Sequence, residues 1–235
     1  MAAAEIGIIG CSPDGLRRRA FDRGLSLDGL ETGEWEYGCR ILLSEDEHIL
    51  KGEDIRSVFE PFCLDPAGNP AGKAVNSAKA AGSLIVLAES CTGGLAGALI
   101  SEIPGCSSVF WGSMVTYANG AKERVLAVDT LQRFGAVSGP TVEAMARGAL
   151  EISGATGAAS ISGIAGPDGG SADKPVGTVW FAFNAGGRES TLRCVFGGDR
   201  QRIRRQAAAC ALAGLANQID GALLDIGWIA GYTSY

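Results

Sequence analysis

The sequence predicts a layered α/β domain with a largely buried sheet, preceded by a small N-terminal extension of mixed strands and loops. Three observations support this prediction. From about residue 73, stretches with helical spacing alternate with short strand-like runs. One of these runs, 84–88, is continuously apolar, which is typical of a strand covered on both faces. The many glycines cluster in turns and show no periodic repeat, so an ordinary globular chain is indicated.

Residues 1–70 are expected to form the N-terminal extension. The stretch 34–43 has a strand-like pattern, bounded by Thr32-Gly33 on one side and by an acidic run on the other. The basic triplet 17–19 is interpreted as a solvated face. Residues 65–72 have the composition of a turn and mark the predicted boundary. No motif assigns a role to the extension.

Residues 71–235 are expected to form the second domain, in which helices and strands alternate. Helices are predicted at 74–81, after 92–94, at 119–128, from Ser138-Gly139-Pro140 onward and after Asp199; strands are predicted at 84–88, 109–117, 158–164, 177–183 and 191–196. Asp199 is a good N-cap for the last helix. The apolar face of the helix after Ser138 would consist of Val142, Met145, Ala149 and Ile152.

Composition and charge exclude several classes of protein. The net charge of −6 argues against a nucleic-acid-binding protein, which would carry a basic surface. There is no run of about 18 apolar residues, which argues against a membrane protein, and the first ten residues lack the pattern of a secretory signal. The seven cysteines are scattered without a CxxC pair, which favours reduced thiols and a cytoplasmic location.

The first motif that can carry chemistry follows the apolar strand. The segment 89–94 places Ser90 where an α/β protein presents a nucleophile or binds an anion, since backbone N–H groups at a helix start are unpaired. Gly93 and Gly94 would let a ligand approach that backbone closely. The alternative is that Ser90 or Thr92 merely caps the helix, and this segment alone does not decide between the two.

A base for such a nucleophile is expected in the segment 116–122. The chain has one histidine, His48, which lies in a charged stretch far from every motif, so Ser-His-Asp catalysis and His-ligated zinc are disfavoured. Lys122 is then the natural base, provided that burial lowers its pKa toward neutrality, at a cost of roughly 4–5 kcal/mol. Without a partner such as Ser90, Lys122 would be interpreted as a solvated helix residue.

Two further segments suit an anionic ligand. The Gly-rich loop within 162–177, which includes Gly166, can present N–H groups to a phosphate or a ribose, although it matches neither the Walker loop nor the dinucleotide fingerprint. The arginines between Arg200 and Arg205 offer guanidinium groups to a phosphate monoester, with Arg200 and Arg204 on one helical face. For any single arginine, a purely structural role is an equal alternative.

Four segments in one order resemble the C-terminal domain of the CinA family: 88–94, 115–122, 135–138 and 162–178. The resemblance covers roughly residues 73–220 without large gaps, and four motifs in register are far more specific than one Gly-rich loop. It implies a three-layer α/β/α sandwich that assembles as a homo-oligomer. It also implies an enzyme without metal or cofactor, whose substrate is a pyridine mononucleotide: the carboxamide of nicotinamide mononucleotide would be hydrolysed to nicotinic acid mononucleotide and ammonia.

The same resemblance implies roles for the matching residues. Ser90 would be the nucleophile and Lys122 its general base, while Thr92 and Tyr117 would orient the nucleophile or stabilise the oxyanion. Backbone N–H groups near Thr92 to Gly94 are expected to hold that oxyanion. The residues predicted to bind or surround the substrate are Gly93, Gly94, Asn119, Gly166, Arg200 and Arg204, with an arginine meeting the phosphate.

Some features depart from the family pattern, and alternatives stay open. Residues 1–70 do not resemble the N-terminal domain of the long CinA proteins, and Gly120 stands where the family more often has an acidic residue. Cys91 is an alternative nucleophile. The domain is alternatively a nucleotide-binding module without catalysis, an amidase for a different small amide or, with no support from the charge, an interaction protein.

Overall fold

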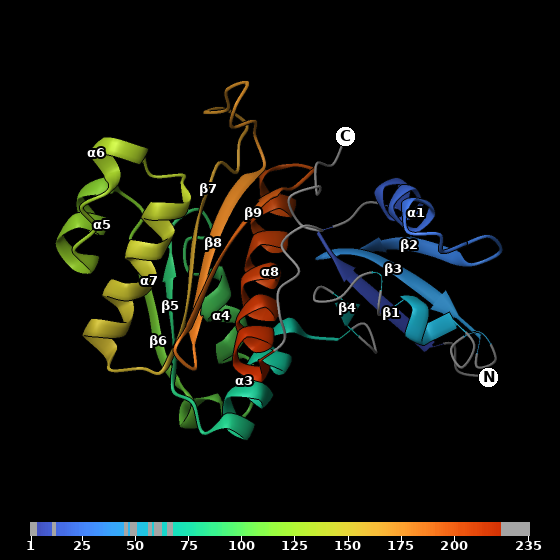
Figure 1. Ribbon diagram of the computed structural model, residues 1–235, viewed down its shortest axis with the longest axis horizontal. Coiled ribbons are helices and arrows are strands. Elements are labelled where there is room, and N and C mark those ends of the chain that lie inside the picture. Colours follow the sequence, from blue (N-terminus) through green and yellow to red (C-terminus); the bar gives the residue numbers. More distant parts are fainter. Residues whose placement is uncertain are drawn as a thin grey trace.

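The computed structural model describes residues 4–10, 13–44, 47, 51–55, 58, 63–64 and 68–221 of the chain. Two sheets that share no strand divide these residues (Figure 1). We call residues 4–64 the N-terminal unit, and the part from residue 68 onward the large domain. His48 and residues 65–67, with which the predicted boundary begins, lie outside the described residues.

The N-terminal unit is built on an antiparallel sheet of order β2-β3-β1-β4. Its elements are β1 (Ala4–Ile9), α1 (Pro13–Asp22), β2 (Glu31–Trp35), β3 (Gly38–Leu43) and β4 (Cys63–Leu64). The prediction that Thr32-Gly33 bounds a strand is wrong, because both residues lie inside β2 and pair with β3. The chain reverses instead at the two-residue turn 36–37. The basic triplet lies on α1, a helix that was not predicted, where Arg17 and Arg18 are exposed.

The large domain is a three-layer α/β/α sandwich, as predicted. Its sheet has the order β6-β5-β7-β8-β9, with strands β5 (Ile85–Glu89), β6 (Phe110–Val115), β7 (Gly157–Gly163), β8 (Thr178–Ala185) and β9 (Arg188–Val195). One face is covered by α3 (Pro70–Ala81), α4 (Leu95–Ser101) and α8 (Arg200–Asp220), and the other by α5 (Asn119–Leu126), α6 (Leu131–Phe134) and α7 (Gly139–Ser153) (Figure 1). A 3-10 turn, η1 (Cys106–Ser108), precedes β6.

β5 is buried along its whole length, which confirms the interpretation of the apolar run. Its side chains alternate between the two layers: Ile85 and Leu87 join the core under α3 and α8, whereas Val86 and Ala88 join the core under α7. A strand covered on both faces leaves only its ends accessible to a ligand, and this places the chemistry at the strand ends.

Two local predictions need correction. α3 begins at Pro70, so residues 70–72 are not a turn; Asn69 caps this helix by accepting from the N–H of Ala71, and Pro70 suits the first helical position because its fixed φ is helical and it has no N–H to leave unpaired. In α7, Val142, Met145 and Ala149 are buried as predicted, but Ile152 is 49% exposed because it belongs to the last turn of the helix.

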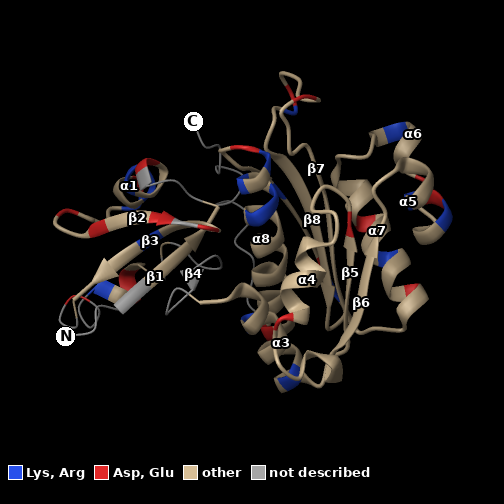
Figure 2. Cartoon of the chain, turned by 180° about the vertical axis from the view of Figure 1, so that it is seen from behind, with Lys and Arg blue, Asp and Glu red and all other residues tan. Residues whose placement is uncertain are grey.

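The helices in the described ranges include none that is long and apolar enough to cross a membrane. Five cysteines in those ranges carry free thiols, at positions 39, 91, 106, 194 and 210. The two units meet along the first turns of α8, where basic residues gather next to the N-terminal sheet (Figure 2).

Candidate active site

Four strand ends meet at one edge of the large sheet. β5, β6 and β7 are parallel, and β9 points the same way because it is antiparallel to β8, which is itself antiparallel to β7. Their carboxyl ends therefore lie at the edge where open α/β sheets bind ligands. The segments that leave this edge are 90–94, 116–122, 164–177 and 197–204, the same segments that the sequence analysis singled out.

Ser90 and Lys122 are brought into contact at this edge. Lys122 Nζ lies 2.9 Å from Ser90 Oγ across a separation of 32 residues in the chain. Ser90 is 8% exposed and Lys122 is 1% exposed. The N–H of Ser90 donates to the carbonyl of Ile161 on β7 at 2.9 Å, which fixes the backbone of the serine against the sheet. A hydroxyl within hydrogen-bonding distance of a base is the arrangement of an activated nucleophile.

The amino group of Lys122 has two further partners. It donates to the carbonyls of Thr116 at 2.7 Å and of Tyr117 at 2.9 Å. Burial lowers the pKa of Lys122 below its ordinary value. A neutral amine has two N–H groups and one lone pair. When the two N–H groups point at the carbonyls, the lone pair faces Ser90 Oγ and can accept the proton of its hydroxyl.

Cys91 is poorly suited to be the nucleophile. Its thiol is almost completely buried, and burial, together with the charge of Glu89, raises its pKa to about 12. The thiolate is the reactive form of cysteine, so a thiol with this pKa is inert near neutral pH. The hydrogen bond of Lys122 Nζ goes to Ser90 Oγ, which favours the serine.

The prediction of an oxyanion site near Thr92 to Gly94 needs correction. The N–H of Gly94 donates to the Glu89 carboxylate at 3.0 Å, and the N–H of Gly93 donates to the carbonyl of Ser90 at 3.0 Å. Within the described part of the chain, the N–H groups of Cys91 and Thr92 donate to no other residue. These two N–H groups come directly after Ser90 and are the backbone donors of the turn from which no other described residue accepts a hydrogen bond.

Sequence reasoning missed Glu89. This residue is completely buried, and its carboxylate accepts four hydrogen bonds of 2.7–3.1 Å, from the N–H groups of Gly94, Ala96 and Gly97 and from the hydroxyl of Ser113. A signal was present in the sequence. An acidic residue ends a strand that is otherwise apolar and buried on both faces, and a buried carboxylate requires several donors.

Thr92, Tyr117 and Asn119 lie at the site in different ways. Thr92 is completely buried, and its hydroxyl has no hydrogen-bond partner among the residues that the structure describes. Tyr117 is 57% exposed, and its phenol accepts from Arg200 at 3.1 Å. The carbonyl of Tyr117, and not its phenol, accepts from Lys122. Asn119 is the exposed first residue of α5.

The arginines of α8 face two directions. Arg200 donates to the phenol of Tyr117 and, at 2.7 Å, to the carbonyl of Gly166, while Arg204 donates to the carbonyl of Thr92 at 2.6 Å. Both therefore border the segments that surround Ser90. Their spacing of four residues places them on one face of the helix, as predicted.

The other two arginines face the N-terminal unit. Arg202 pairs with Glu34 at 3.2 Å and donates to the carbonyl of Gly38 at 3.2 Å. Arg205 is exposed and interacts electrostatically with Tyr37. Of the four arginines, Arg200 and Arg204 border the segments around Ser90, whereas Arg202 and Arg205 face the N-terminal unit.

The Gly-rich loop contacts Arg200 through Gly166. Gly166 has a φ of 75°, and a Cβ at this position would lie 2.6 Å from the Val176 side chain, so only glycine fits. Lys174 anchors the loop by donating to the carbonyl of Val137 at 2.8 Å. The loop thus presents the carbonyl of Gly166 to Arg200 from a fixed position.

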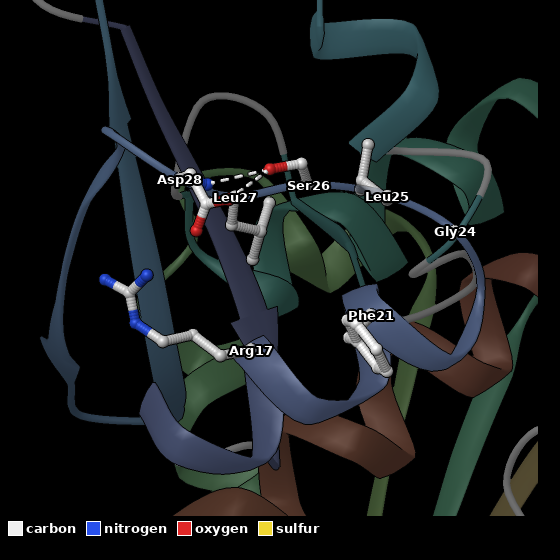
Figure 3. A pocket seen from close by; sticks show the side chains of 7 residues that line it. All are labelled: Arg17, Phe21, Gly24, Leu25, Ser26, Leu27 and Asp28. Carbon is white, nitrogen blue, oxygen red and sulfur yellow. Dashed lines mark hydrogen bonds between the residues drawn. The ribbon is translucent and has the colours of Figure 1, made fainter.

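A separate cavity of about 510 Å³ lies in the N-terminal unit, beside α1 (Figure 3). Arg17, Phe21 and the segment 24–28 line it, and Phe21 is 80% exposed. In its lining Ser26 Oγ donates to Asp28 Oδ2 at 3.0 Å, and both of these residues are exposed. Among the described residues, no group of three or more His, Cys, Asp or Glu side chains is placed to hold a metal ion.

Comparison with known proteins identifies relatives of the large domain. A family model described as the CinA C-terminal domain matches residues 69–219. A protein of Escherichia coli strain K12 named nicotinamide-nucleotide amidohydrolase PncC is 53% identical over 143 residues, which cover 60% of this chain and 87% of the relative. A CinA-like protein of Akkermansia muciniphila is 43% identical over 201 residues, covering 81% of this chain and 49% of the relative. Residues 69–235 make up only about 71% of the chain. Because the alignment with the Akkermansia muciniphila protein covers 81% of the chain, it includes part of the N-terminal unit.

Solved structures of similar proteins superpose on this chain as well. The competence/damage-inducible protein of Agrobacterium tumefaciens superposes with a TM-score of 0.62 at 40% identity, covering 65% of this chain and 96% of that one. The competence damage-inducible protein A of Klebsiella pneumoniae superposes with a TM-score of 0.62 at 36% identity, covering 64% and 95%.

Proposed function

Because this chain belongs to the CinA C-terminal domain family, we propose that it hydrolyses the carboxamide of nicotinamide mononucleotide to nicotinic acid mononucleotide and ammonia by a Ser-Lys mechanism. The relative named nicotinamide-nucleotide amidohydrolase PncC is 53% identical over a segment that covers 87% of its length, and this supports the proposed substrate. The observation that carries the mechanism is the 2.9 Å contact between the buried amine of Lys122 and Ser90 Oγ.

The proposed reaction has two stages. Ser90 Oγ attacks the carboxamide carbon while Lys122 accepts the hydroxyl proton, and the carbonyl oxygen becomes an oxyanion. The N–H groups of Cys91 and Thr92 are the proposed donors to that oxyanion. The C–N bond then breaks, and ammonia leaves with the proton that Lys122 returns. Water, deprotonated by Lys122, attacks the acyl-enzyme, and Ser90 recovers its proton as the ester bond breaks.

The rest of the site is assigned to the nucleotide. Arg200 and Arg204 are the proposed contacts for the phosphate, because guanidinium groups bind phosphate oxygens through paired N–H donors. The exposed Gly93 and the neighbouring Gly94 are proposed to let the substrate approach the turn closely, and Asn119 and Gly166 are proposed to lie beside the bound substrate. Thr92, which is completely buried, is proposed to orient the nucleophile or to stabilise the oxyanion, and Tyr117 is proposed to orient Arg200.

We also propose that the chain forms a homo-oligomer. β6 is an edge strand of the large sheet, and it carries Trp111 and Val115, which are 46% and 48% exposed. An uncovered edge with large apolar side chains favours association. Light scattering on the full chain at assay concentration tests this proposal, and a monomeric mass would contradict it.

The function is tested by measuring ammonia and nicotinic acid mononucleotide released by the full chain. We expect turnover by the wild type, a loss of at least about 10³-fold in Ser90→Ala and Lys122→Met, and nearly full activity in Cys91→Ala. Full activity in Ser90→Ala would overturn the mechanism.

A substrate panel separates the alternatives. Nicotinamide and nicotinamide riboside lack the phosphate, so equal turnover of all three compounds would indicate an amidase of another class. Binding of the mononucleotide by calorimetry without any turnover would indicate a nucleotide-binding module.

A further inference from the structure

We propose that Glu89 is a positioning residue of the catalytic turn: its buried carboxylate holds the start of α4 against β6 and thereby fixes the direction of the N–H groups that follow Ser90. The inference rests on the proposed function, since it assigns a task to a residue of the same site. Glu89 itself is not proposed to touch the substrate.

The carboxylate closes a ring around the catalytic turn. Glu89 immediately precedes Ser90, and its Oε2 accepts from the N–H of Gly94 at 3.0 Å and of Ala96 at 3.1 Å. The residues between these anchors, 90–93, form the turn that carries the nucleophile. Because both ends of the turn are tied to one residue, the backbone of Cys91 and Thr92 has little freedom.

The other carboxylate oxygen ties the same turn to the neighbouring strand. Glu89 Oε1 accepts from the N–H of Gly97 at 2.8 Å and from the hydroxyl of Ser113 on β6 at 2.7 Å. A Cβ at Gly97 would lie 2.7 Å from the Ser113 side chain and 3.3 Å from Glu89 Oε1. The close packing of α4 on β6 around the carboxylate therefore requires glycine at position 97.

The main chain of Glu89 serves the base as well as the nucleophile. Its carbonyl accepts from the N–H of Thr116 at 2.9 Å, and the carbonyl of Thr116 accepts from Lys122 Nζ. One residue is thus connected to the turn that carries Ser90 and to the segment that orients Lys122.

Glu89 replaces the cap that α4 lacks. The N-cap residue is Gly94, which has no side chain to accept from the helix N–H groups. The carboxylate supplies that acceptor from β5, and its charge suits the positive end of a helix. As a consequence the N–H groups at the start of α4 are already occupied, and the proposed donors to an oxyanion are those of Cys91 and Thr92.

The test compares full-length Glu89→Gln, Ser113→Ala and Asn69→Ala. Glutamine has one acceptor oxygen instead of two, so an amide NH2 would face backbone donors. The hydrogen bonds to one of the two carboxylate oxygens would therefore be lost. Asn69→Ala removes the cap of α3, at the other end of the domain, and controls for stability lost through an ordinary cap. For each protein, kcat, KM, the melting temperature and the rate at which a fluorophosphonate probe labels Ser90 are measured.

We expect Glu89→Gln to lower kcat and the labelling rate about 10–100-fold with KM changed less than about threefold, since a small displacement of reacting groups has effects of this size. Ser113→Ala should also lower kcat and the labelling rate with little change in KM, but by a smaller factor. Asn69→Ala should lower only the melting temperature. Wild-type kcat and labelling in folded Glu89→Gln would overturn the inference; if that variant does not fold, unchanged values in Ser113→Ala would do so.

The labelling assay keeps the two proposals distinguishable. Labelling of wild-type Ser90 without turnover of nicotinamide mononucleotide would contradict the proposed substrate, while the labelling rate of Glu89→Gln would still decide the role of Glu89. Turnover by the wild type with equal rates in Glu89→Gln would contradict the inference alone. A wild type that neither turns over nor is labelled would contradict both.

Discussion

The two units of the molecule bury different kinds of side chain. In the N-terminal unit the buried core is apolar, with Ile6, Ile8, Leu16 and Ile41 at its centre. In the large domain the core also contains buried Ser, Thr, Asn, Gln, Glu and Lys side chains, and among the described residues all of these lie at or after Ser77. Several of them surround the carboxyl ends of β5 and β6: Glu89, Ser90, Thr92, Thr116 and Lys122.

This difference indicates where the candidate active site lies without reference to any relative. Burying a charged or hydroxyl-bearing group costs free energy unless its hydrogen bonds are replaced, so such groups persist where they serve a purpose. Lys122 has no carboxylate partner in the described part of the chain, and methionine would fill a similar volume. The described residues of the N-terminal unit include no buried polar or charged side chain of this kind, so we expect that unit to support the large domain and not to supply catalytic groups.

The largest expected effect comes from removing the ability of residue 122 to lose a proton. Lys122→Arg keeps a positive charge and several donors, but a guanidinium does not deprotonate in a protein. We expect kcat/KM to fall at least about 10³-fold. Lys73→Arg, at a half-buried lysine that donates to Asn217, is the matched control and should keep wild-type kinetics. Equal losses in both variants would mean that arginine disturbs the domain generally.

The next effect is the pH dependence that Lys122 imposes. Its pKa is lowered in the folded protein, so the neutral amine that accepts a proton from Ser90 persists to lower pH than in an ordinary lysine. Activity should rise with pH and reach its plateau below the ordinary value of 10.5, falling about tenfold for each pH unit below the lowered pKa. The profile of kcat/KM measures this limb, and a midpoint at or above 10.5 would contradict a desolvated base.

The same shift predicts the sign of a stability change. Between the lowered pKa and 10.5 the unfolded chain binds more protons than the folded one, so the free energy of unfolding rises with pH. The slope is on the order of 1.4 kcal/mol per pH unit within this window. Lys122→Met lacks this contribution. In denaturant titrations, the free energy of unfolding of the wild type should therefore increase relative to that of Lys122→Met as the pH is raised.

The sequence predicted the large domain well because its signals are local. An apolar run predicted the buried strand β5, and turn and capping residues such as Ser138 and Asp199 marked helix starts that the structure confirms. The N-terminal unit was harder. The turn 36–37 contains neither Gly nor Pro, so Thr32-Gly33 was chosen as a boundary instead, although a glycine inside a strand is tolerated at some cost.

The site was predicted in part, for reasons that depend on distance along the chain. Ser90 and Lys122 carried motif signals, but their contact, the burial of the amine and its two carbonyl partners result from the parallel pairing of β5 and β6. The occupation of the α4 start by Glu89 was not foreseen, because helix starts are generally treated as open. Which arginines face the site depended on the position of the N-terminal unit, for which no motif existed.

A moderate effect distinguishes the two faces of α8. Arg200→Ala and Arg204→Ala should each raise KM for nicotinamide mononucleotide about tenfold, because a hydrogen bond to a charged group contributes about 1.5–3 kcal/mol. Arg205→Ala, on the face toward the N-terminal unit, should leave KM within about twofold. Steady-state kinetics on the three variants provide the measurement. A larger rise in Arg205→Ala than in Arg204→Ala would reverse the assignment of the two faces.

The smallest expected effect concerns the contact between the two units. Arg202 pairs with a Glu34 side chain that is 72% exposed, and such surface pairs contribute about 0–1 kcal/mol. Since Arg202 also donates to the carbonyl of Gly38, Arg202→Ala should lower the melting temperature by about 2–4 °C, whereas Glu34→Ala should lower it less. Both variants should keep kcat and KM within about twofold, because the side chains that contact Ser90 and Lys122 all come from the large domain. A loss of activity in Glu34→Ala without a loss of stability would show that the N-terminal unit contributes to the site, and the contrast between a supporting unit and a catalytic domain would no longer hold.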